Sequence, residues 1–164
     1  MIQVGESIPE ATFKIMGDNG PQKLTSAEIF GGKRVVMFGV PGAFTPGCTR
    51  THLPGYVEHA EEILAQGFDE IVCVAVNDAW VMDAWGNSVG AQGKVKMLAD
   101  GSADFARAAG LELDLNHVGM GMRCKRFSMV VQNGIVESLN IDERMIESTS
   151  AIHTCGLSLS LIHI

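Results

Sequence analysis

Three short apolar runs, each bounded by charged or turn-forming residues, constrain the fold of this chain more than any other feature. They cover residues 34–40 (RVVMFGV), 70–76 (EIVCVAV) and 126–132 (RFSMVVQ). A continuous apolar run of this length is typical of a strand that is buried on both faces of a sheet. The third run also begins a hairpin, because Asn133-Gly134 separates it from a further strand at 135–139.

Helical patterns alternate with these strands. Residues 48–66 place Tyr56, Ala60 and Ile63 on one face of a long helix, and Gly67 ends it. Strands that alternate with helices and finish in a hairpin predict an α/β fold, with a mixed β-sheet flanked by helices, in one domain. The shorter expected elements are strands at 11–16 and 94–98, a helical turn at 25–30, and helices from Asn77-Asp78 through Trp85 and at 103–109.

Charge and hydropathy exclude several classes of function. Twelve Lys and Arg against nineteen Asp and Glu give a net charge of −7, which argues against nucleic acid as a partner because there is no excess of cations for phosphates. No stretch approaches the roughly 20 apolar residues of a membrane span. The first residues lack the basic and apolar regions of a signal peptide. We therefore expect a cytoplasmic protein without membrane or nucleic-acid partners.

Four cysteines are too few for a disulfide scaffold in a chain of 164 residues. In a reducing compartment each of them is either a buried apolar residue or a reactive thiol. They are Cys48, Cys73, Cys124 and Cys155.

Residues 40–55 (VPGAFTPGCTRTHLPG) carry the most chemical information. They lie between a buried strand and the long helix, where ligand sites in open α/β sheets occur. Thr45 can act as the helix N-cap and Pro46 suits the first helical position. Cys48 then falls in the first turn, where unpaired N–H groups and the helix dipole favour a thiolate. The segment therefore indicates either a nucleophilic cysteine or a small residue that fills the helix start.

His52 lies four residues after Cys48 and shares its helix face. It can be a general base, a structural hydrogen-bonding residue or a metal ligand. Zinc needs three or four protein ligands, and the sequence has no second close Cys/His pair, so we expect no metal. Three residues from Cys48 stand Thr45 and Thr51, so the chain lacks the Cys-x-x-Cys motif of disulfide oxidoreductases.

The segment 41–48 (PGAFTPGC) resembles the Pro-x-x-x-Thr-x-x-Cys signature of peroxiredoxins. Its continuation through 51–56 (THLPGY) resembles the type-five, atypical two-cysteine branch, as do 76–78 (VND) and 125–131 (KRFSMVV). The similarity extends from about Val4 to Asp142.

This resemblance implies a thioredoxin-like fold and reduction of hydrogen peroxide or organic hydroperoxides, without a cofactor. Cys48 would be the peroxidatic cysteine that becomes a sulfenic acid. Pro41 would shield the thiolate from water, and Thr45 would hydrogen-bond the peroxide oxygens. Arg126 would hold the thiolate and stabilise charge on the leaving oxygen. His52 would support the pocket by hydrogen bonding.

Arg126 fits that role physically, since it begins an apolar strand where an unpaired charge is costly. An exposed cation at a strand edge is the simpler interpretation of such a residue, and the Lys-Arg-Phe context favours the catalytic one. Arg123 is the nearest alternative, ranked second.

The resemblance also implies a reductant: glutathione, glutaredoxin or thioredoxin. In the type-five branch a cysteine near the C-terminus can attack the sulfenic acid and form an intramolecular disulfide. Cys155 alone has that placement and is the candidate resolving cysteine. Cys73 lies in a buried strand and is expected in the core. Cys124 can be a neutral neighbour of the site or a thiol of moderate reactivity.

Two parts of the chain are expected to differ in origin. Residues 1–142 form the peroxiredoxin domain. Residues 143–164 are a divergent tail with little helical periodicity, and we hypothesise that they are an artefact of cloning or sequence assembly. Resequencing the locus tests this, because an intact genomic sequence through Ile164 would contradict it.

Other functions stay open from the sequence. Oxidation of Cys48 could serve a non-enzymatic redox sensor or chaperone. The glycine-rich residues 119–122 (GMGM) are a weak indication of a flavin or nucleotide site, because they follow no clear strand. We interpret them as a loop whose Met120 and Met122, with Phe44, form an apolar rim. The family implies a homodimer through a face near the active site.

Overall fold

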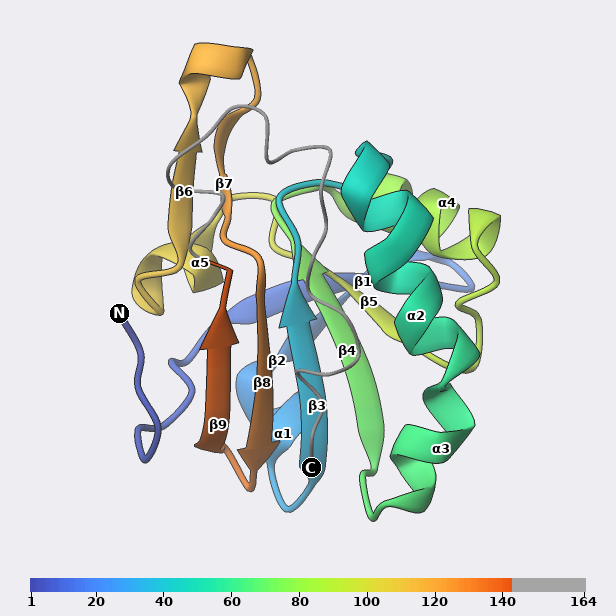
Figure 1. Cartoon of the computed structure of the whole chain (residues 1–164), viewed down its shortest axis with the longest axis vertical. Coiled ribbons are helices and arrows are strands. Elements are labelled where there is room, and N and C mark those ends of the chain that lie inside the picture. Colours follow the sequence, from blue (N-terminus) through green and yellow to red (C-terminus); the bar gives the residue numbers. More distant parts are fainter. Residues whose placement is uncertain (143–164) are drawn as a thin grey trace.

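A mixed β-sheet forms the centre of the molecule in the computed structural model, which describes residues 1–142 (Figure 1). The described residues form seven strands of this sheet, in the order β2-β1-β5-β4-β3-β8-β9. The strands are β1 (Thr12–Gly17), β2 (Gly20–Thr25), β3 (Arg34–Gly39), β4 (Glu70–Ala75), β5 (Lys96–Ala99), β8 (Phe127–Gln132) and β9 (Ile135–Ile141).

Strand directions make the sheet mixed. β3 and β4 are parallel, as are β4 and β5, whereas β8 runs antiparallel to β3 and β9 antiparallel to β8. β1 closes the other side antiparallel to β5. This architecture confirms the predicted α/β, thioredoxin-like fold.

Helices cover both faces of the sheet, and α2, α3 and α4 lie together on one of them (Figure 1). The helical elements are α1 (Ser26–Phe30), η1 (Cys48–His52), α2 (Leu53–Glu58), α3 (Ala60–Ala65), α4 (Ala79–Ser88), α5 (Asp104–Ala108) and the short η2 (Asn116–Val118). None of these helices is long and apolar enough to cross a membrane.

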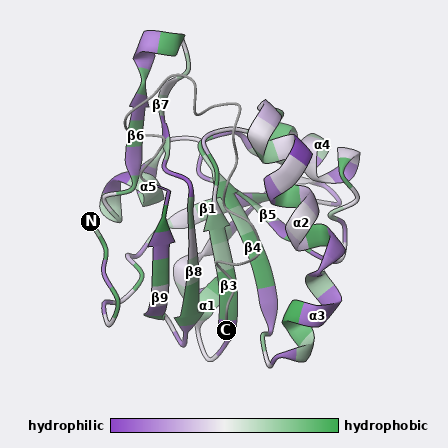
Figure 2. Cartoon of the chain, in the orientation of Figure 1, coloured by the Kyte–Doolittle hydropathy of each residue, from purple (hydrophilic) through white to green (hydrophobic). Residues whose placement is uncertain are grey.

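The alternation of side chains along β3 divides the core in two. Val35 and Met37 pack on the face covered by α1 and α5, whereas Val36 and Phe38 pack on the face of α2 to α4. Figure 2 shows β3 and much of β4 as continuously hydrophobic ribbons. A strand buried on both faces needs this continuous pattern, which is why the sequence predicts it.

The expected continuous helix over 48–66 is wrong in detail. The chain first makes one π-helical turn, η1, in which the Leu53 N–H bonds to the Cys48 carbonyl. Pro54 follows and has no N–H to continue an ordinary α-helical ladder. A second break occurs at His59, whose φ of −100° and ψ of 12° are not helical. Three short pieces therefore replace one long helix.

Two further differences concern strands. β2 is a polar edge strand whose Pro21 and Lys23 give no alternating apolar signal. β6 (Glu112–Leu115) and β7 (Gly121–Cys124) form a separate hairpin that extends beyond the sheet (Figure 1). The predicted hairpin between β8 and β9 is confirmed, with Asn133 and Gly134 at φ of 47° and 78°. Residues 143–164, with the predicted tail and Cys155, lie outside the described residues.

Candidate active site

The candidate site lies at the edge of the sheet where β3 ends. Because β8 runs antiparallel to β3, the start of β8 lies beside the end of β3, with Gly39 opposite Phe127. This register places Arg126 next to the loop that leads from β3 to Cys48. Cys48 and Arg126, which are 78 residues apart in the sequence, therefore come into contact.

The loop before Cys48 is held by local contacts. Pro41 and Gly42 are buried, and Phe44 has the left-handed φ of 62°. The Thr45 hydroxyl donates to the Gly42 carbonyl at 2.7 Å, so it closes the loop and is not the side-chain cap that we expected. The Thr45 carbonyl accepts from the Thr49 N–H at 3.0 Å, and helix begins at Pro46 as predicted.

Cys48, Arg126 and His52 meet in a buried cluster. Arg126 donates from Nη2 to the Cys48 sulfur at 3.3 Å, and its Nη1 lies 2.8 Å from His52 Nδ1. The three residues are 1%, 3% and 4% exposed. A guanidinium is always charged and its nitrogens only donate, so the sulfur and the imidazole nitrogen both accept from it. The structure thus brings together three of the predicted site residues.

His52 is neutral in this environment. Burial, and then the charge of Arg126, lower the pKa of His52 from 6.5 to about 3. Because the guanidinium donates, Nδ1 accepts, and the ring proton is assigned to Nε2. The lone pair that a general base would use is therefore directed at Arg126. This geometry agrees with the hydrogen-bonding interpretation, and residues 1–142 contain no group of three potential metal ligands.

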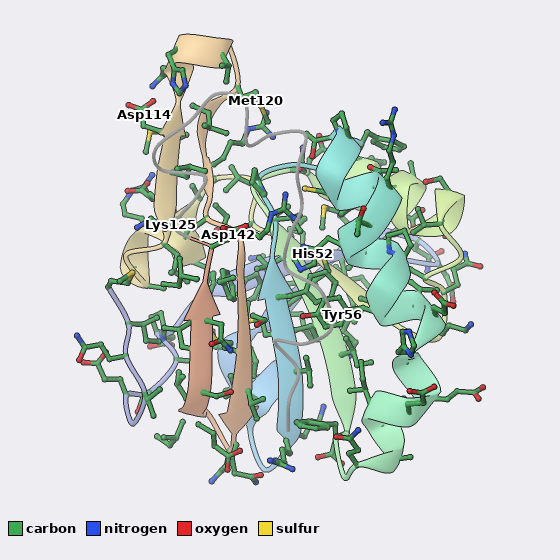
Figure 3. All side chains as sticks on the ribbon, viewed as in Figure 1. His52, Tyr56, Asp114, Met120, Lys125 and Asp142 are labelled. Carbon is green, nitrogen blue, oxygen red and sulfur yellow. The ribbon has the colours of Figure 1, made fainter. Side chains whose placement is uncertain are left out.

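Two aromatic rings fix the position of His52. Phe38 and Tyr56 stack with their centroids 3.8 Å apart, and the imidazole lies 5.2 Å and 5.5 Å from them. Figure 3 labels His52 and Tyr56 between α2 and the sheet. We did not predict this support, although the spacing of four residues between His52 and Tyr56 indicates a shared helix face.

Arg123, the alternative to Arg126, lies in a different environment. Its Nε donates to the Met120 carbonyl at 2.7 Å and its Nη1 to the Val76 carbonyl at 3.3 Å. It therefore joins the β6–β7 hairpin to the end of β4. Of the two arginines, Arg126 is the one with a described contact to the Cys48 sulfur.

Cys73 and Cys124 are core residues. Their exposed fractions are 0% and 1%, and burial raises the pKa of both thiols. The expectation for Cys73 is confirmed, and of the two alternatives for Cys124 the structure favours the neutral neighbour. Cys155 is not among the described residues.

Two residues at the site were not singled out from the sequence. Asn77 Oδ1 accepts from the Ala43 N–H at 2.9 Å, and the Trp85 indole donates to the Thr49 hydroxyl at 3.0 Å. Both belong to the segment that follows β4. Asn77 belongs to the segment 76–78 that carries part of the family resemblance, but its hydrogen bond to the loop before Cys48 was not predicted.

Comparisons with known proteins decide the family. The chain matches the Redoxin family model over residues 3–151. It is 42% identical over 142 residues to peroxiredoxin-2D of Arabidopsis thaliana, an alignment that covers 86% of this chain and 88% of that protein. The chain belongs to the peroxiredoxin family. As a peroxiredoxin it is a thiol peroxidase, an oxidoreductase that reduces peroxide with electrons from a thiol.

Solved structures agree with this peroxiredoxin assignment. Reduced Prx3 of Vibrio vulnificus in complex with hydrogen peroxide is 45% identical with a TM-score of 0.83, over 87% of this chain and 89% of that one. Peroxiredoxin 5 of Alvinella pompejana is 32% identical with a TM-score of 0.78, over 85% and 89%. The thioredoxin-like fold of this peroxiredoxin is thus shared with both.

Proposed function

We propose that Cys48 is the peroxidatic cysteine of this peroxidase. Its thiolate attacks one oxygen of the peroxide, an S–O bond forms and the O–O bond breaks. The sulfur loses two electrons and becomes a sulfenic acid, and the leaving oxygen takes a proton to form water or an alcohol. The 3.3 Å contact between Arg126 Nη2 and the Cys48 sulfur is the observation that carries this proposal.

The neighbouring residues have separate roles in the proposed step. Arg126 holds the thiolate and stabilises charge on the leaving oxygen, and His52 orients Arg126. Because the Thr45 hydroxyl donates to the Gly42 carbonyl, its oxygen accepts from the O–H of the peroxide, and the buried ring of Pro41 excludes water. The hydrogen bond from His52 Nδ1 to Arg126 at 2.8 Å supports the orienting role.

A peroxidase assay tests the role of Cys48. Cys48→Ser should abolish turnover of hydrogen peroxide by a thiol reductant, whereas Cys124→Ser, a matched change at a buried thiol, should retain it. Turnover in Cys48→Ser would contradict the proposal. A stoichiometric reaction of the wild-type chain without turnover would favour a sensor or chaperone.

We further propose that the chain belongs to the type-five branch and uses glutathione, glutaredoxin or thioredoxin. The similarity to peroxiredoxin 5 of Alvinella pompejana supports the branch. Cys155 is the candidate resolving cysteine if residues 143–164 are native, and a one-cysteine reaction is the alternative if they are an artefact. Mass spectrometry after one equivalent of peroxide distinguishes the two-cysteine reaction from the one-cysteine reaction. A Cys48–Cys155 disulfide supports the two-cysteine reaction, and a glutathione adduct on Cys48 supports the one-cysteine reaction. We also propose that the protein is located in the cytoplasm and that it forms a homodimer.

A further inference from the structure

The turn that carries Cys48 is held on both sides by one segment of the chain. Before Cys48, the Ala43 N–H donates to the side chain of Asn77 at 2.9 Å. Directly after Cys48, the hydroxyl of Thr49 accepts from the Trp85 indole at 3.0 Å. Since Asn77 and Trp85 both belong to the β4–α4 segment, this segment fixes the position of the turn.

Trp85 is the rigid partner in the second contact. Its side chain is completely buried in the core beneath α4. The start of α4 is capped by Asp78, whose Oδ1 accepts from the Val81 N–H at 2.9 Å. Thr49 is only half-buried and lies in the π-helical turn η1. A movement of the turn would therefore break the contact by displacing Thr49.

The turn must move between oxidation of Cys48 by peroxide and its reduction by a thiol. The Cys48 residue is 1% exposed, so a small peroxide can reach the sulfur more readily than a peptide or protein thiol can. In the reductive half, the attacking thiol forms an S–S bond to Cys48 and the S–O bond breaks, releasing water. A second thiol then attacks the sulfur of the first, Cys48 leaves as a thiolate, and the two reductant thiols are released as a disulfide. Direct contact between two sulfurs needs an open turn.

We propose that Trp85 is a positioning residue, and that its hydrogen bond to Thr49 is a latch that keeps the Cys48 turn closed for peroxide and limits its opening to the reductant. This proposal rests on the proposed role of Cys48. The latch acts on the position of the turn, and neither residue touches the reacting sulfur in the described contacts.

The latch predicts that the thiol step is sensitive to loss of the hydrogen bond and that the peroxide step is not. Removing one net hydrogen bond should raise the population of the open turn about threefold to tenfold. The rate constant for reduction by a thiol should rise by the same factor, because it depends on the open form. The rate constant for peroxide should change less than about twofold, because the closed form still dominates.

Variants at either partner remove the hydrogen bond, and Thr49→Val is the primary test because it keeps the shape of the side chain. Thr49→Val removes the acceptor and Trp85→Phe removes the donor, while Thr49→Ser retains the hydroxyl and should restore wild-type behaviour. Thr51→Val is the matched control on the same turn, because Thr51 is exposed and makes no side-chain hydrogen bond within the described residues. Trp80→Phe makes the same chemical change elsewhere on α4, at a side chain that is 65% exposed.

The two rate constants are measured separately by rapid quenching and intact-mass analysis. Every variant carries Cys155→Ser, so that the sulfenic acid formed by hydrogen peroxide is captured only by added glutathione. We expect Thr49→Val and Trp85→Phe both to accelerate the glutathione step, with the larger effect in Trp85→Phe because it also removes buried side-chain volume. If one of them does not fold, the other still tests the latch.

Three results would overturn the latch: equal changes in both rate constants, an unchanged glutathione step in Thr49→Val, or the same acceleration in Thr51→Val. Cys48→Ser separates this failure from that of the proposed function. If Cys48→Ser still consumes peroxide, the role of Cys48 is wrong. If it is inactive and the expected split is absent, only the latch is wrong.

Discussion

Arg126 carries a buried positive charge at the candidate site. A buried positive charge is costly unless an opposite charge or hydrogen-bond acceptors compensate it. The Cys48 sulfur and His52 Nδ1 accept two of its hydrogen bonds, at 3.3 Å and 2.8 Å. The same contacts orient the guanidinium toward the sulfur, so in the proposed step it lies close to the leaving oxygen, on which negative charge develops as the O–O bond breaks.

Replacing Arg126 with Met should therefore slow the peroxide reaction by about 10²- to 10³-fold, the loss typical of one preorganised donor. Stopped-flow mixing with hydrogen peroxide measures the rate, and far-UV circular dichroism checks that the fold survives. Arg123→Met is the matched control and should lose much less, since Arg123 donates to backbone carbonyls. Wild-type rates in Arg126→Met would show that the role is wrong.

The buried imidazole of His52 makes stability depend on pH. The pKa of His52 is about 3 in the folded state, whereas the unfolded chain binds the proton near pH 6.5. Between these values the unfolded state holds more protons, so stability is complete above pH 6.5 and falls as the pH decreases. The expected loss is about 1.4 kcal/mol per pH unit in that window.

Urea denaturation at several values between about pH 5 and pH 7.5 measures how the free energy of unfolding depends on pH. His52→Gln is the informative variant, because glutamine can still accept from Arg126 but does not titrate. The free energy of unfolding of the wild type should fall more steeply than that of the variant as the pH is lowered. Parallel curves would show that His52 is not held neutral.

Among the secondary-structure elements, the short helices depend on contacts from outside themselves. α5 is an example, since the carboxylate of Asp100 accepts from the N–H groups of Phe105 and Ala106 at 3.1 Å and 2.9 Å. Asp100 precedes the helix and is only 3% exposed. A helix of this length has little stability of its own, so these bonds determine where it begins.

Asp100→Ala should lower the free energy of unfolding by about 2–4 kcal/mol, because it leaves two buried N–H groups unpaired. Chemical denaturation measures the change. Asp104→Ala in the same helix is the control and should change stability by less than about 1 kcal/mol, since its ion pair with Arg107 is exposed. Equal effects of the two variants would contradict the capping role of Asp100.

The elements differ in how well the sequence predicts them. β3, β4, β8 and β9 follow from apolar runs and from the Asn133-Gly134 turn, because burial on both faces leaves a direct pattern. The breaks at Pro54 and His59 arise from hydrogen-bond geometry that side-chain periodicity does not encode. The β6–β7 strands have four residues each, too few for a periodic signal.

In the candidate site, too, some features are predictable from the sequence and others depend on the tertiary structure. Cys48, Thr45 and Pro41 are recognisable because they stand close together in one motif. The meeting of Cys48 with Arg126 depends on the register of β8 against β3, which is a tertiary property. Trp85 gave no signal, since an indole that donates one hydrogen bond has the same sequence pattern as any core tryptophan.

For the whole molecule, the exposed apolar residues support the predicted homodimer. Phe44 and Trp80 are 54% and 65% exposed, and Met122 is 40% exposed. Phe44 lies in the Cys48 loop, and Trp80 lies in α4, the helix that also supplies Trp85. Of these, Phe44 belongs to the loop before Cys48, so a partner surface beside the site would include it.

Phe44→Asp should shift the chain from dimer to monomer, because it places a charge on this surface. Sedimentation velocity at several concentrations measures the change. Ile135→Asp is the control, at an apolar side chain of similar exposure (41%) on β9. A dimer that survives Phe44→Asp, or a wild-type monomer, would contradict the prediction.

The separation of 78 residues between Cys48 and Arg126 also has a consequence for protein synthesis. On the ribosome, the cysteine is translated long before its guanidinium partner. Until β8 docks beside β3, the nascent chain has a thiol but lacks the cation that would direct its reaction with peroxide. Peroxidase activity should therefore begin only late in translation, because a product that terminates before β8 lacks both Arg126 and the strand that pairs with β3.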